Sequence, residues 1–521
     1  MEFLNFILGL LPILWLAVAL TALKMPAYKA CPIALVIAIV LALAKWQDSA
    51  VSVATGALDG AIMALWPISL VIVAAIFTYN LCVKTGAMDC IKDMLTSISN
   101  DRRVLALILG WGFGGFMEGM AGFGTAVAIP ASILVGLGFN PVLAAVACLV
   151  ANATPTAFGS IGIPTTTAAS LTGIPSGELA GVVMLQMCLL VFITPFFMTL
   201  MVGGGFKGMK GAWGVTLVSA LSFVVPQFLT AMLIGAELPN VIASIVCMVA
   251  TGFYAKKFMK KTDPKFAVVK EEGAAAEAAQ KPQMGKLRAW SPFILIFVLL
   301  LVTSSIVAPV HNLLAQASTT VQIYAGGPNA EATTQTFNWI LAPGVLIFIS
   351  AFVGGLIQNA SWKTMGGVLG SSLKQMSKTI LTLVCILAAA KIMGYAGMTA
   401  SIAEFLALSG VAYPLFAPLI GSIGTFVTGS ATSSSVLFAN LQAAAAESLS
   451  VSPVWLVAAN GIGATAGKIL SPQSITIATA STGTVGDESK IMRKAAPYYV
   501  IFVVAFGVIA LLGQPLMALF G

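Results

Sequence analysis

The chain has very few of the residues on which most enzymes depend. Only 8% of its 521 residues are charged, and His311 is its single histidine. It contains no phosphate-binding loop, no His-Glu-x-x-His zinc motif and no Gly-x-Ser-x-Gly nucleophile motif. It also contains no ring of like charges and no selectivity-filter motif. These absences argue against an enzyme and against a passive channel.

Cysteine pairs and basic clusters are missing as well. The seven cysteines are scattered singly through apolar stretches, without a Cys-x-x-Cys pair. We expect them to be small buried side chains, and neither a disulfide framework nor a metal site nor any other cofactor is predicted. The net charge of +8 does not indicate nucleic acid, because the basic residues do not gather in one aromatic-containing patch.

What the chain has in abundance is apolar length. Hydrophobic residues make up 59% of the sequence, more than a soluble core could cover. Nearly uncharged windows recur, and each, with its flanking residues, can cross about 30 Å of hydrocarbon. Membrane spans, the first of them uncleaved, are predicted at 3–23, 31–45, 60–82, 104–127, 179–202, 211–234, 238–255, 291–309, 339–359, 379–397, 411–428 and 497–520.

The basic residues predict how these spans are oriented. Of the 26 Lys and Arg, 23 fall in loops that can all be placed on the cytoplasmic side with consistent crossing parity. The intervening loops at 46–59, 174–178, 235–239 and 310–338 contain no Lys or Arg. Both termini are therefore predicted outside. The charged segment 256–290 is predicted to be a cytoplasmic linker, helical in part, between two membrane halves, 1–255 and 291–521.

An internal repeat joins the two halves. The stretch Gly114–Gly122 is similar in residue types to Gly424–Thr432, and the spacing Asn-x6-Gly-x4-Pro that begins at Asn152 recurs at Asn460. By loop charge the two repeat cores, 104–177 and 411–483, enter the membrane from opposite sides, which predicts an inverted-topology repeat. The first half adds a helix pair at 211–255.

Breaks in both repeat cores predict the fold. Pro, Gly, Ser and Thr are too frequent there for uninterrupted helices, and such breaks are tolerated at membrane depth only beside protein or a watery cavity. We expect an all-α polytopic fold in which each copy contributes a re-entrant hairpin and a broken helix. The breaks should meet near the midplane.

Three segments, Gly115–Gly138, Gly424–Leu441 and Gly467–Ser474, resemble the L-lactate permease family of bacterial carriers. The strings are long, and the likeness extends over most of both halves. The resemblance implies proton-coupled symport of L-lactate and related 2-hydroxymonocarboxylates, such as glycolate, across the cytoplasmic (inner) membrane. A more distant similarity to ion-coupled carboxylate carriers implies an elevator-like moving domain.

Two buried charges are the first candidates for function. Glu118 lies in the first copy, where a carboxylate is costly to bury unless it is protonated or paired, and it is the predicted proton-coupling residue. Lys468 lies at a break of the second copy, where an ammonium would attract a carboxylate substrate. The alternatives are a structural carboxylate bound to backbone amides and a Glu118–Lys468 ion pair that fixes the two copies together.

Polar residues at the breaks are the remaining candidates. Helix ends with free amides and hydroxyls suit a small anion, although Ser, Thr and Gly also serve close helix packing. Lys391 and Tyr395 are further candidates, with snorkelling of Lys391 to the membrane surface as the alternative. His311 is expected to serve a surface or capping role. The predicted substrate-binding residues are Lys468, Asn152, Thr154, Asn460, Gln473, Ser474, Ser430, Ser433, Lys391 and Tyr395.

The expected partners follow from this hypothesis. They are a small carboxylate, protons and the lipid bilayer, without nucleic acid, and a homodimer is compatible with the sequence. A sodium-coupled carrier of another small carboxylate is the alternative function, because unwound segments rich in carbonyls and hydroxyls can also hold sodium.

Overall fold

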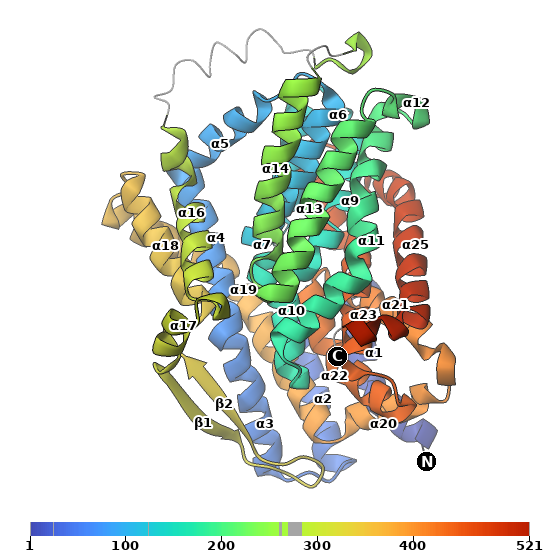
Figure 1. The fold of residues 1–521 in the computed structure, drawn as a ribbon. Coiled ribbons are helices and arrows are strands. Elements are labelled where there is room, and N and C mark those ends of the chain that lie inside the picture. The colour runs from blue at the N-terminus through green and yellow to red at the C-terminus, as the bar shows by residue number, and fades with distance from the viewer. Residues whose placement is uncertain (1, 24, 123, 260–262, 269–283, 520–521) are drawn as a thin grey trace.

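Long apolar helices dominate the computed structural model, which describes the chain except for residues 1, 24, 123, 260–262, 269–283 and 520–521 (Figure 1). Among the described residues, nine helices are long and apolar enough to cross a membrane. A tenth is added if the bent pair at 141–172 counts as one span. The chain is therefore a multi-pass membrane protein.

The first half begins with three long apolar segments and continues through short, broken helices into three more. Its elements are α1 (Glu2–Thr21), α2 (Ala27–Ala44), α3 (Ala50–Met63), η1 (Ala64–Ser69), α4 (Leu70–Lys84), α5 (Ala87–Thr96), α6 (Arg102–Leu105), η2 (Ala106–Phe113), α7 (Gly114–Met120), α8 (Thr125–Gly136), α9 (Pro141–Ala151), η3 (Thr154–Phe158), α10 (Gly159–Thr172), α11 (Ser176–Gly203), α12 (Phe206–Met209), α13 (Trp213–Leu233) and α14 (Pro239–Phe258).

The second half follows a short turn, η4 (Pro264–Phe266). Its elements are α16 (Lys286–Val302), η5 (Ser305–Val307), α17 (Ala308–Ala315), β1 (Ser318–Tyr324), β2 (Thr333–Asn338), α18 (Pro343–Ile357), α19 (Trp362–Tyr395), α20 (Met398–Ala407), η6 (Gly410–Ala412), α21 (Tyr413–Thr428), α22 (Ala431–Leu449), α23 (Pro453–Leu470), α24 (Pro472–Thr482), α25 (Glu488–Leu512) and η7 (Gln514–Leu519).

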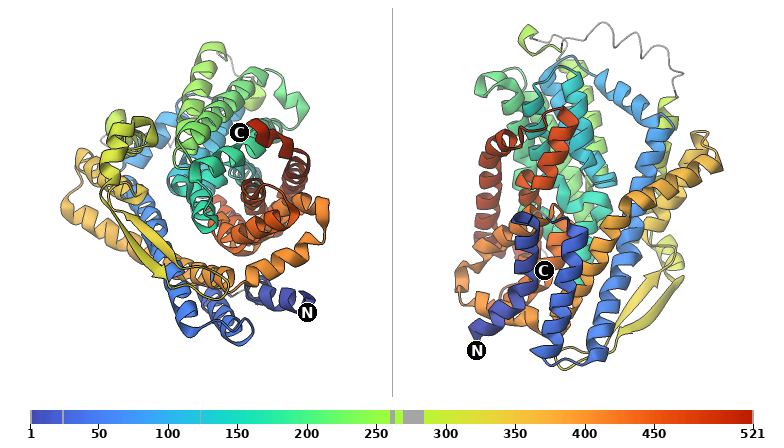
Figure 2. Two further views of the ribbon diagram at one scale, coloured as in Figure 1. Left: turned by 60° about the horizontal axis from the view of Figure 1, so that its bottom comes forward. Right: turned by 180° about the vertical axis from the view of Figure 1, so that it is seen from behind.

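The helices pack into two groups. The core group consists of α7 to α11, α13, α14 and α21 to α25, in which helices of both halves interlock. The side group consists of α2, α3, α4, α16, α18 and α19: the long helix α19 packs on α2, α3 and α4, and α18 packs on α4 and α16. Figure 2 shows the helices of the core group gathered into one bundle, with the blue N-terminal helices and the yellow hairpin to one side.

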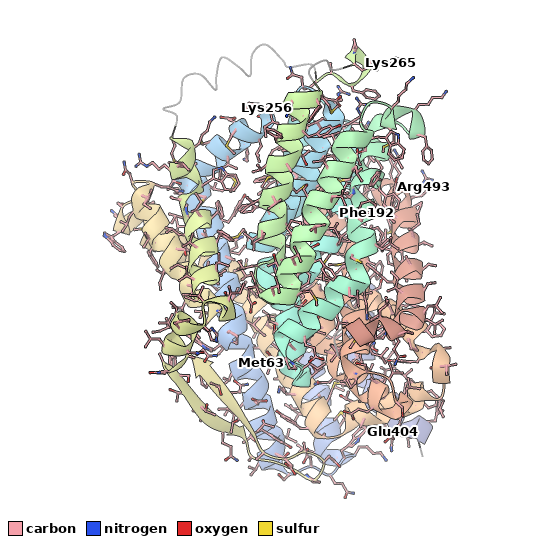
Figure 3. The ribbon with its side chains drawn as sticks, in the orientation of Figure 1. Met63, Phe192, Lys256, Lys265, Glu404 and Arg493 are labelled. Carbon is pink, nitrogen blue, oxygen red and sulfur yellow. The ribbon has the colours of Figure 1, made fainter. Side chains whose placement is uncertain are left out.

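Charge is distributed unevenly between the two ends of the molecule. Lys256 and Lys265 lie at one end and Arg493 toward it, whereas Glu404 lies at the other end (Figure 3). At the basic end the start of the linker folds onto the chain: Val268 donates a backbone hydrogen bond to Asn100. Of the predicted linker 256–290, residues 256–258 belong to α14 and 286–290 to α16, and residues 260–262 and 269–283 lie outside the described residues.

The prediction of an all-α fold is wrong at one place. Residues 318–338, predicted to be a loop, contain an antiparallel hairpin of β1 and β2. The strand sequences are rich in Thr, Val, Ile and Tyr, which favour extended backbone, and the loop between them contains Gly and Pro. Burial raises the pKa of the Tyr324 hydroxyl, which lies 2.8 Å from the hydroxyl of Ser52 on α3.

Several predicted loops are helical instead. α19 begins at Trp362, so the basic residues at 363–378 lie on a helix of 34 residues and not in a loop. Ser361 caps this helix by accepting a hydrogen bond from the backbone N–H of Thr364. Most of the predicted loop 46–59 belongs to α3, which Ser49 caps in the same way. α18, with 15 residues, is shorter than the predicted span 339–359.

Candidate functional site

Each repeat core contains a helical hairpin with a glycine turn. In the first, η2 and α7 pack against α8, and in the second, α21 packs against α22. Gly122, Gly124 and Gly429 at the two turns have φ values of +59°, +87° and +74°, a conformation that other residues rarely adopt. At Gly429 a side chain would also collide with Gln473, because a Cβ atom there would lie 2.0 Å from its Oε1.

A broken segment follows each hairpin. In the first core the chain bends by 49° between α9 and the η3–α10 segment. Ser160, Ile161 and Gly162 then adopt three successive left-handed conformations, with φ of 46°, 57° and 76°. A β-branched residue such as Ile161 is rarely held in this region, and such strain concentrates at functional sites. In the second core the break between α23 and α24 lies at Ser471.

The two cores pack reciprocally. α10, from the broken segment of the first core, contacts α22, which is an arm of the second hairpin. α24, from the broken segment of the second core, contacts α8, which is an arm of the first hairpin. The hairpin turns and the breaks of both cores are thereby brought together in the interior of the core group.

A buried ion pair lies where the two cores meet. Nζ of Lys468 on α23 donates to Oε1 of Glu118 on α7 at 2.6 Å, and the two residues are 8% and 2% exposed. With the Asn152 amide turned so that its nitrogen faces the glutamate, it donates to Oε2 of Glu118 at 2.9 Å and accepts from Lys468 at 3.3 Å. Each core thus contributes one charge, and Asn152 bonds to both.

Gly159 makes the position of the glutamate possible. A Cβ atom at Gly159 would lie 2.6 Å from Oε1 of Glu118, so any larger residue would displace the carboxylate. The backbone of Gly159 is extended, with φ of −66° and ψ of 153°, which other residues also adopt. The glycine therefore serves close approach to the carboxylate and not an unusual backbone conformation.

A cavity of about 160 Å³ opens beside the ion pair. By this measure one water molecule needs about 10–15 Å³, so several water molecules or a small organic anion can be accommodated. The polar lining comes mainly from the hairpin turn of the second core and the breaks of both cores, and it includes Glu118, Thr156, Ser160, Thr428, Ser430, Thr432, Ser433, Lys468, Gln473 and Ser474.

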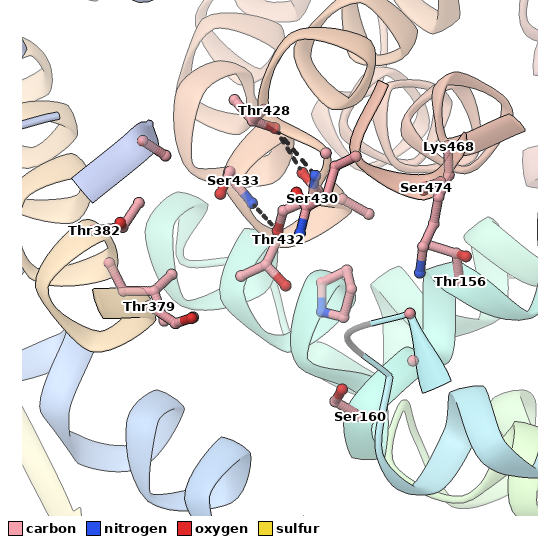
Figure 4. A pocket seen from close by; sticks show the side chains of 18 of the residues that line it. Thr156, Ser160, Thr379, Thr382, Thr428, Ser430, Thr432, Ser433, Lys468 and Ser474 are labelled. Atoms are coloured by element: carbon pink, nitrogen blue, oxygen red, sulfur yellow. Dashed lines mark hydrogen bonds between the residues drawn. The ribbon is translucent and has the colours of Figure 1, made fainter. Parts of the chain in front are cut away.

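Two helices begin at the cavity. Ser430 caps α22 by accepting from the backbone N–H of Ser433 at 3.2 Å, and Ser471 caps α24 by accepting from the N–H of Ser474 at 3.1 Å. Helix N-termini carry partial positive charge and favour anions. Figure 4 shows Ser430, Ser433 and Lys468 facing this space, with Thr379 and Thr382 of α19 across from them. The electrostatics of the cavity therefore suit a small carboxylate.

The structure brings some of the sequence-predicted residues to this cavity and not others. Lys468, Gln473, Ser474, Ser430, Ser433 and Glu118 line it, and Asn152 contacts the ion pair behind it. Thr154 and Asn460 are not part of the lining; Oγ1 of the first and Oδ1 of the second are buried without a hydrogen-bond partner among the described residues.

Lys391 and Tyr395 belong to a second buried network. Nζ of Lys391 lies 3.1 Å from Oδ2 of Asp59 on α3, and the Tyr395 hydroxyl donates to the same oxygen at 2.6 Å. Gln335 of β2 donates to Oδ1 of Asp59 at 2.6 Å, and the ring of Tyr324 stacks on that of Tyr395 at 3.8 Å. This network, in which Asp59 is 1% exposed, fastens the hairpin to α3 and α19. The contact with Asp59 therefore explains the position of Lys391 without snorkelling to the membrane surface.

Residues in three places contribute to the cavity or its surroundings but were not predicted from the sequence. Thr379 and Thr382 line the cavity from α19, but isolated threonines in an apolar span carry no signal. Asp59 was missed because it was assigned to a loop. Asn240 on α14 donates to the carbonyl of Pro155, a group freed by the break after α9, and accepts from Gln227 at 2.7 Å. The helix pair α13–α14 therefore supports the broken segment.

His311 has a capping contact. Its Nδ1 atom lies 2.9 Å from the carbonyl oxygen of Thr303, near the end of α16. This geometry agrees with the expected capping role. No group of three His, Cys, Asp or Glu side chains that could hold a metal ion occurs within the described part of the chain.

Comparisons with known proteins show the relatives of this chain. The sequence model of the family described as L-lactate permease matches residues 5–517. An L-lactate permease of Streptococcus iniae is 43% identical over 87% of this chain and 93% of its own. The glycolate permease GlcA of Escherichia coli (strain K12) is 36% identical over 98% and 95% of the two chains. Among solved structures, MtrF of Neisseria gonorrhoeae, described as one of a class of antimetabolite efflux pumps, is similar with a TM-score of 0.44. The sequence identity is 14%, and the match covers 88% of this chain and 83% of the MtrF chain.

Proposed function

Because the chain belongs to the L-lactate permease family, we propose that it is a secondary transporter of L-lactate and related small 2-hydroxymonocarboxylates, driven by proton symport. Full-length similarity to an L-lactate permease and to a glycolate permease supports this class of substrate. The family membership does not identify the coupling ion, which we infer from the site.

The observation that carries the proposal is the Lys468–Glu118 ion pair beside a cavity. The ammonium group has three N–H donors. Glu118 and Asn152 accept two of them, and Lys468 also lines the cavity. The third donor is thus the natural partner of a substrate carboxylate, which the N-termini of α22 and α24 attract as well. The hydroxyls of Ser430, Ser433 and Ser474, which line the same cavity, would bond the 2-hydroxyl group.

Coupling follows because Glu118 and the substrate carboxylate compete for the charge of Lys468. With Glu118 ionised, the pair is neutral and the lysine charge is already compensated. Protonation of Glu118 leaves the lysine as a net positive charge, which stabilises a bound carboxylate in this buried site. Loss of the substrate anion restores the ion pair and favours release of the proton. One proton would therefore accompany one monocarboxylate, and the loaded site would be neutral overall.

The repeat supports a mechanism of alternating access. We propose that the two repeat cores are inverted-topology copies, which the reciprocal packing of α10 on α22 and α24 on α8 supports. We propose further that the core group moves against the side group in an elevator-like manner. The position of the cavity, between the repeat cores on one side and helices α1, α2, α4 and α19 on the other, supports this division. In this arrangement the basic loops are cytoplasmic and both termini lie outside.

Uptake into proteoliposomes tests the proposal. Labelled L-lactate is expected to accumulate when the outside is more acidic than the lumen, and to accumulate equally well when sodium is replaced by choline. Uptake that ignores the proton gradient would remove the coupling proposal, and uptake that requires sodium would support the sodium-coupled alternative. Competition by glycolate, pyruvate and succinate then defines the substrate range.

A further inference from the structure

The cavity beside the ion pair has two unlike walls. One is polar and belongs to the core group: it carries Lys468, Glu118 and the serine-rich N-termini of α22 and α24. The opposite wall comes from α1, α2, α4 and α19 and is largely apolar. Its apolar members are Leu20, Ala27, Cys31, Ile72, Leu383 and Ile386.

Few hydroxyl groups interrupt the apolar wall. The hydroxyl of Thr382 donates to the carbonyl of Lys378 in its own helix at 2.9 Å, so its donor is already used. Thr379, which the cavity also touches, lies one turn earlier on the same helix. The wall therefore offers few hydrogen-bond partners for a charged group, and a carboxylate turned toward it would lose its hydration without compensation.

This polarity orients a 2-hydroxy acid. Its carboxylate and 2-hydroxyl need the donors of the core group, so the third group on C2 must face the apolar wall. That group is a hydrogen atom in glycolate and a methyl group in L-lactate, and it is the point at which members of this substrate class differ.

The smallest residues of the apolar wall lie together on α2. Ala27 and Cys31 are four positions apart, which places them on one face of the helix. The other apolar members are Leu or Ile, and Ile72, Leu383 and Ile386 are at most 3% exposed, so they have little freedom to move aside. The space in front of α2 is therefore set by two small side chains.

We propose that this apolar wall, and Ala27 and Cys31 in particular, set the largest C2 substituent that the transporter accepts. The inference rests on the proposed function, since it assigns an orientation to the same substrates. It adds a specificity site contributed by the side group, opposite the residues that bind the carboxylate.

Two variants with opposite effects test the proposal. Ala27→Val fills the space in front of α2 and is expected to lower L-lactate transport relative to glycolate transport. One methyl-sized group in an apolar pocket changes kcat/KM by about 10- to 200-fold, so the ratio of the two kcat/KM values should fall by at least about 10-fold. Leu383→Ala enlarges the space and is expected to raise transport of 2-hydroxybutanoate relative to L-lactate by a similar factor.

Each variant carries its own control. Glycolate uptake in the same proteoliposomes reports folding and intact coupling, and Val36→Leu on the exposed face of α2, where Val36 is 57% exposed, should leave all ratios unchanged. The proposed specificity site would be overturned if the ratios of kcat/KM between substrates were unchanged in both Ala27→Val and Leu383→Ala. It would also be overturned if transport of all substrates fell by one common factor. Wild-type protein that transports none of these acids would instead overturn the proposed function.

Discussion

Nζ of Lys468 lies 2.6 Å from Oε1 of Glu118, although 350 positions separate the two residues. The pair joins α23 of one repeat core to α7 of the other, and neither charge has a charged equivalent in the opposite copy: Thr428 aligns with Glu118 and Ser160 with Lys468. The contact is thus asymmetric with respect to the proposed repeat, and it is the feature on which the coupling proposal depends.

Removal of the glutamate charge should separate binding from coupling. Glu118→Gln keeps an oxygen acceptor for Lys468 but cannot exchange a proton. Proton-driven accumulation of L-lactate should be lost, whereas exchange of external for internal L-lactate should persist, because the lysine and the helix N-termini remain. Uptake and exchange are measured in the same proteoliposomes, and accumulation that still follows the proton gradient would exclude Glu118 as the coupling residue.

Stability should depend on whether one or both charges are removed. Lys468→Met leaves the Glu118 carboxylate buried without its ammonium partner, and breaking a buried pair in this way costs about 3–5 kcal/mol. The double variant Lys468→Met/Glu118→Gln should recover much of this loss, because no uncompensated charge remains. Thermal unfolding in detergent gives the comparison. A double variant that is no more stable than the lysine variant would show that Lys468→Met leaves no uncompensated charge in the site.

The close approach of Gly159 to Glu118 predicts a strong effect of one methyl group. Gly159→Ala should displace the carboxylate and lower L-lactate uptake by at least about 10-fold, since small misplacements of reacting groups are costly. Gly177→Ala at the start of α11 is the matched control, because a Cβ atom there meets nothing within 4 Å. Equal uptake by the two variants would show that the carboxylate position is not critical.

Support of the broken segment by α14 is testable at Asn240. Asn240→Leu has a similar size but leaves the carbonyl of Pro155 without its donor, a loss of about 1–3 kcal/mol for a buried group. Lower thermal stability and slower uptake are expected. Gln227→Met is the control, because it removes the neighbour of Asn240 but keeps the bond to Pro155. The control should be milder than Asn240→Leu in both measurements.

The Asp59–Lys391 network should matter for stability and not for substrate affinity. Lys391→Met leaves Asp59 with the Tyr395 and Gln335 donors alone, so the thermal midpoint should fall, and Asp59→Asn in the same chain should restore part of it. The KM for L-lactate should be unchanged in proteoliposomes, because Lys391 does not line the cavity. A raised KM would return Lys391 to the substrate-binding residues predicted from the sequence.

The multi-pass helical fold was well predicted from the sequence because the hydropathy that marks a membrane span is a local property. Hydropathy identifies a span within about 20 residues, and α1, α2, α11, α13 and α14 lie close to their predicted windows. The same locality explains the misses. The hairpin β1–β2 is short and its polar, Gly-containing sequence is typical of a loop, and the buried position of Asp59 becomes visible only when α3, α19 and the hairpin are assembled.

The candidate site was predictable where a charge stood out from apolar surroundings. Glu118 and Lys468 were identified on that ground, and their mutual contact was one of the alternatives that the sequence left open. Residues with ordinary side chains were not identifiable in this way. Thr379, Ala27 and Cys31 face the cavity only because helices of the side group pack beside the two repeat cores, a long-range relationship that no local pattern encodes.

The anchored hairpin provides a fixed reference point for observing motion. Asp59, Tyr395 and Tyr324 tie it to the side group, whereas residues 318–322 of β1 are exposed, Val321 to 43%. A fluorophore or a bound antibody fragment at that strand would stay stationary relative to α3 and α19. Distances from it to a second label on α22 would then test whether the core group moves against the side group, as we propose.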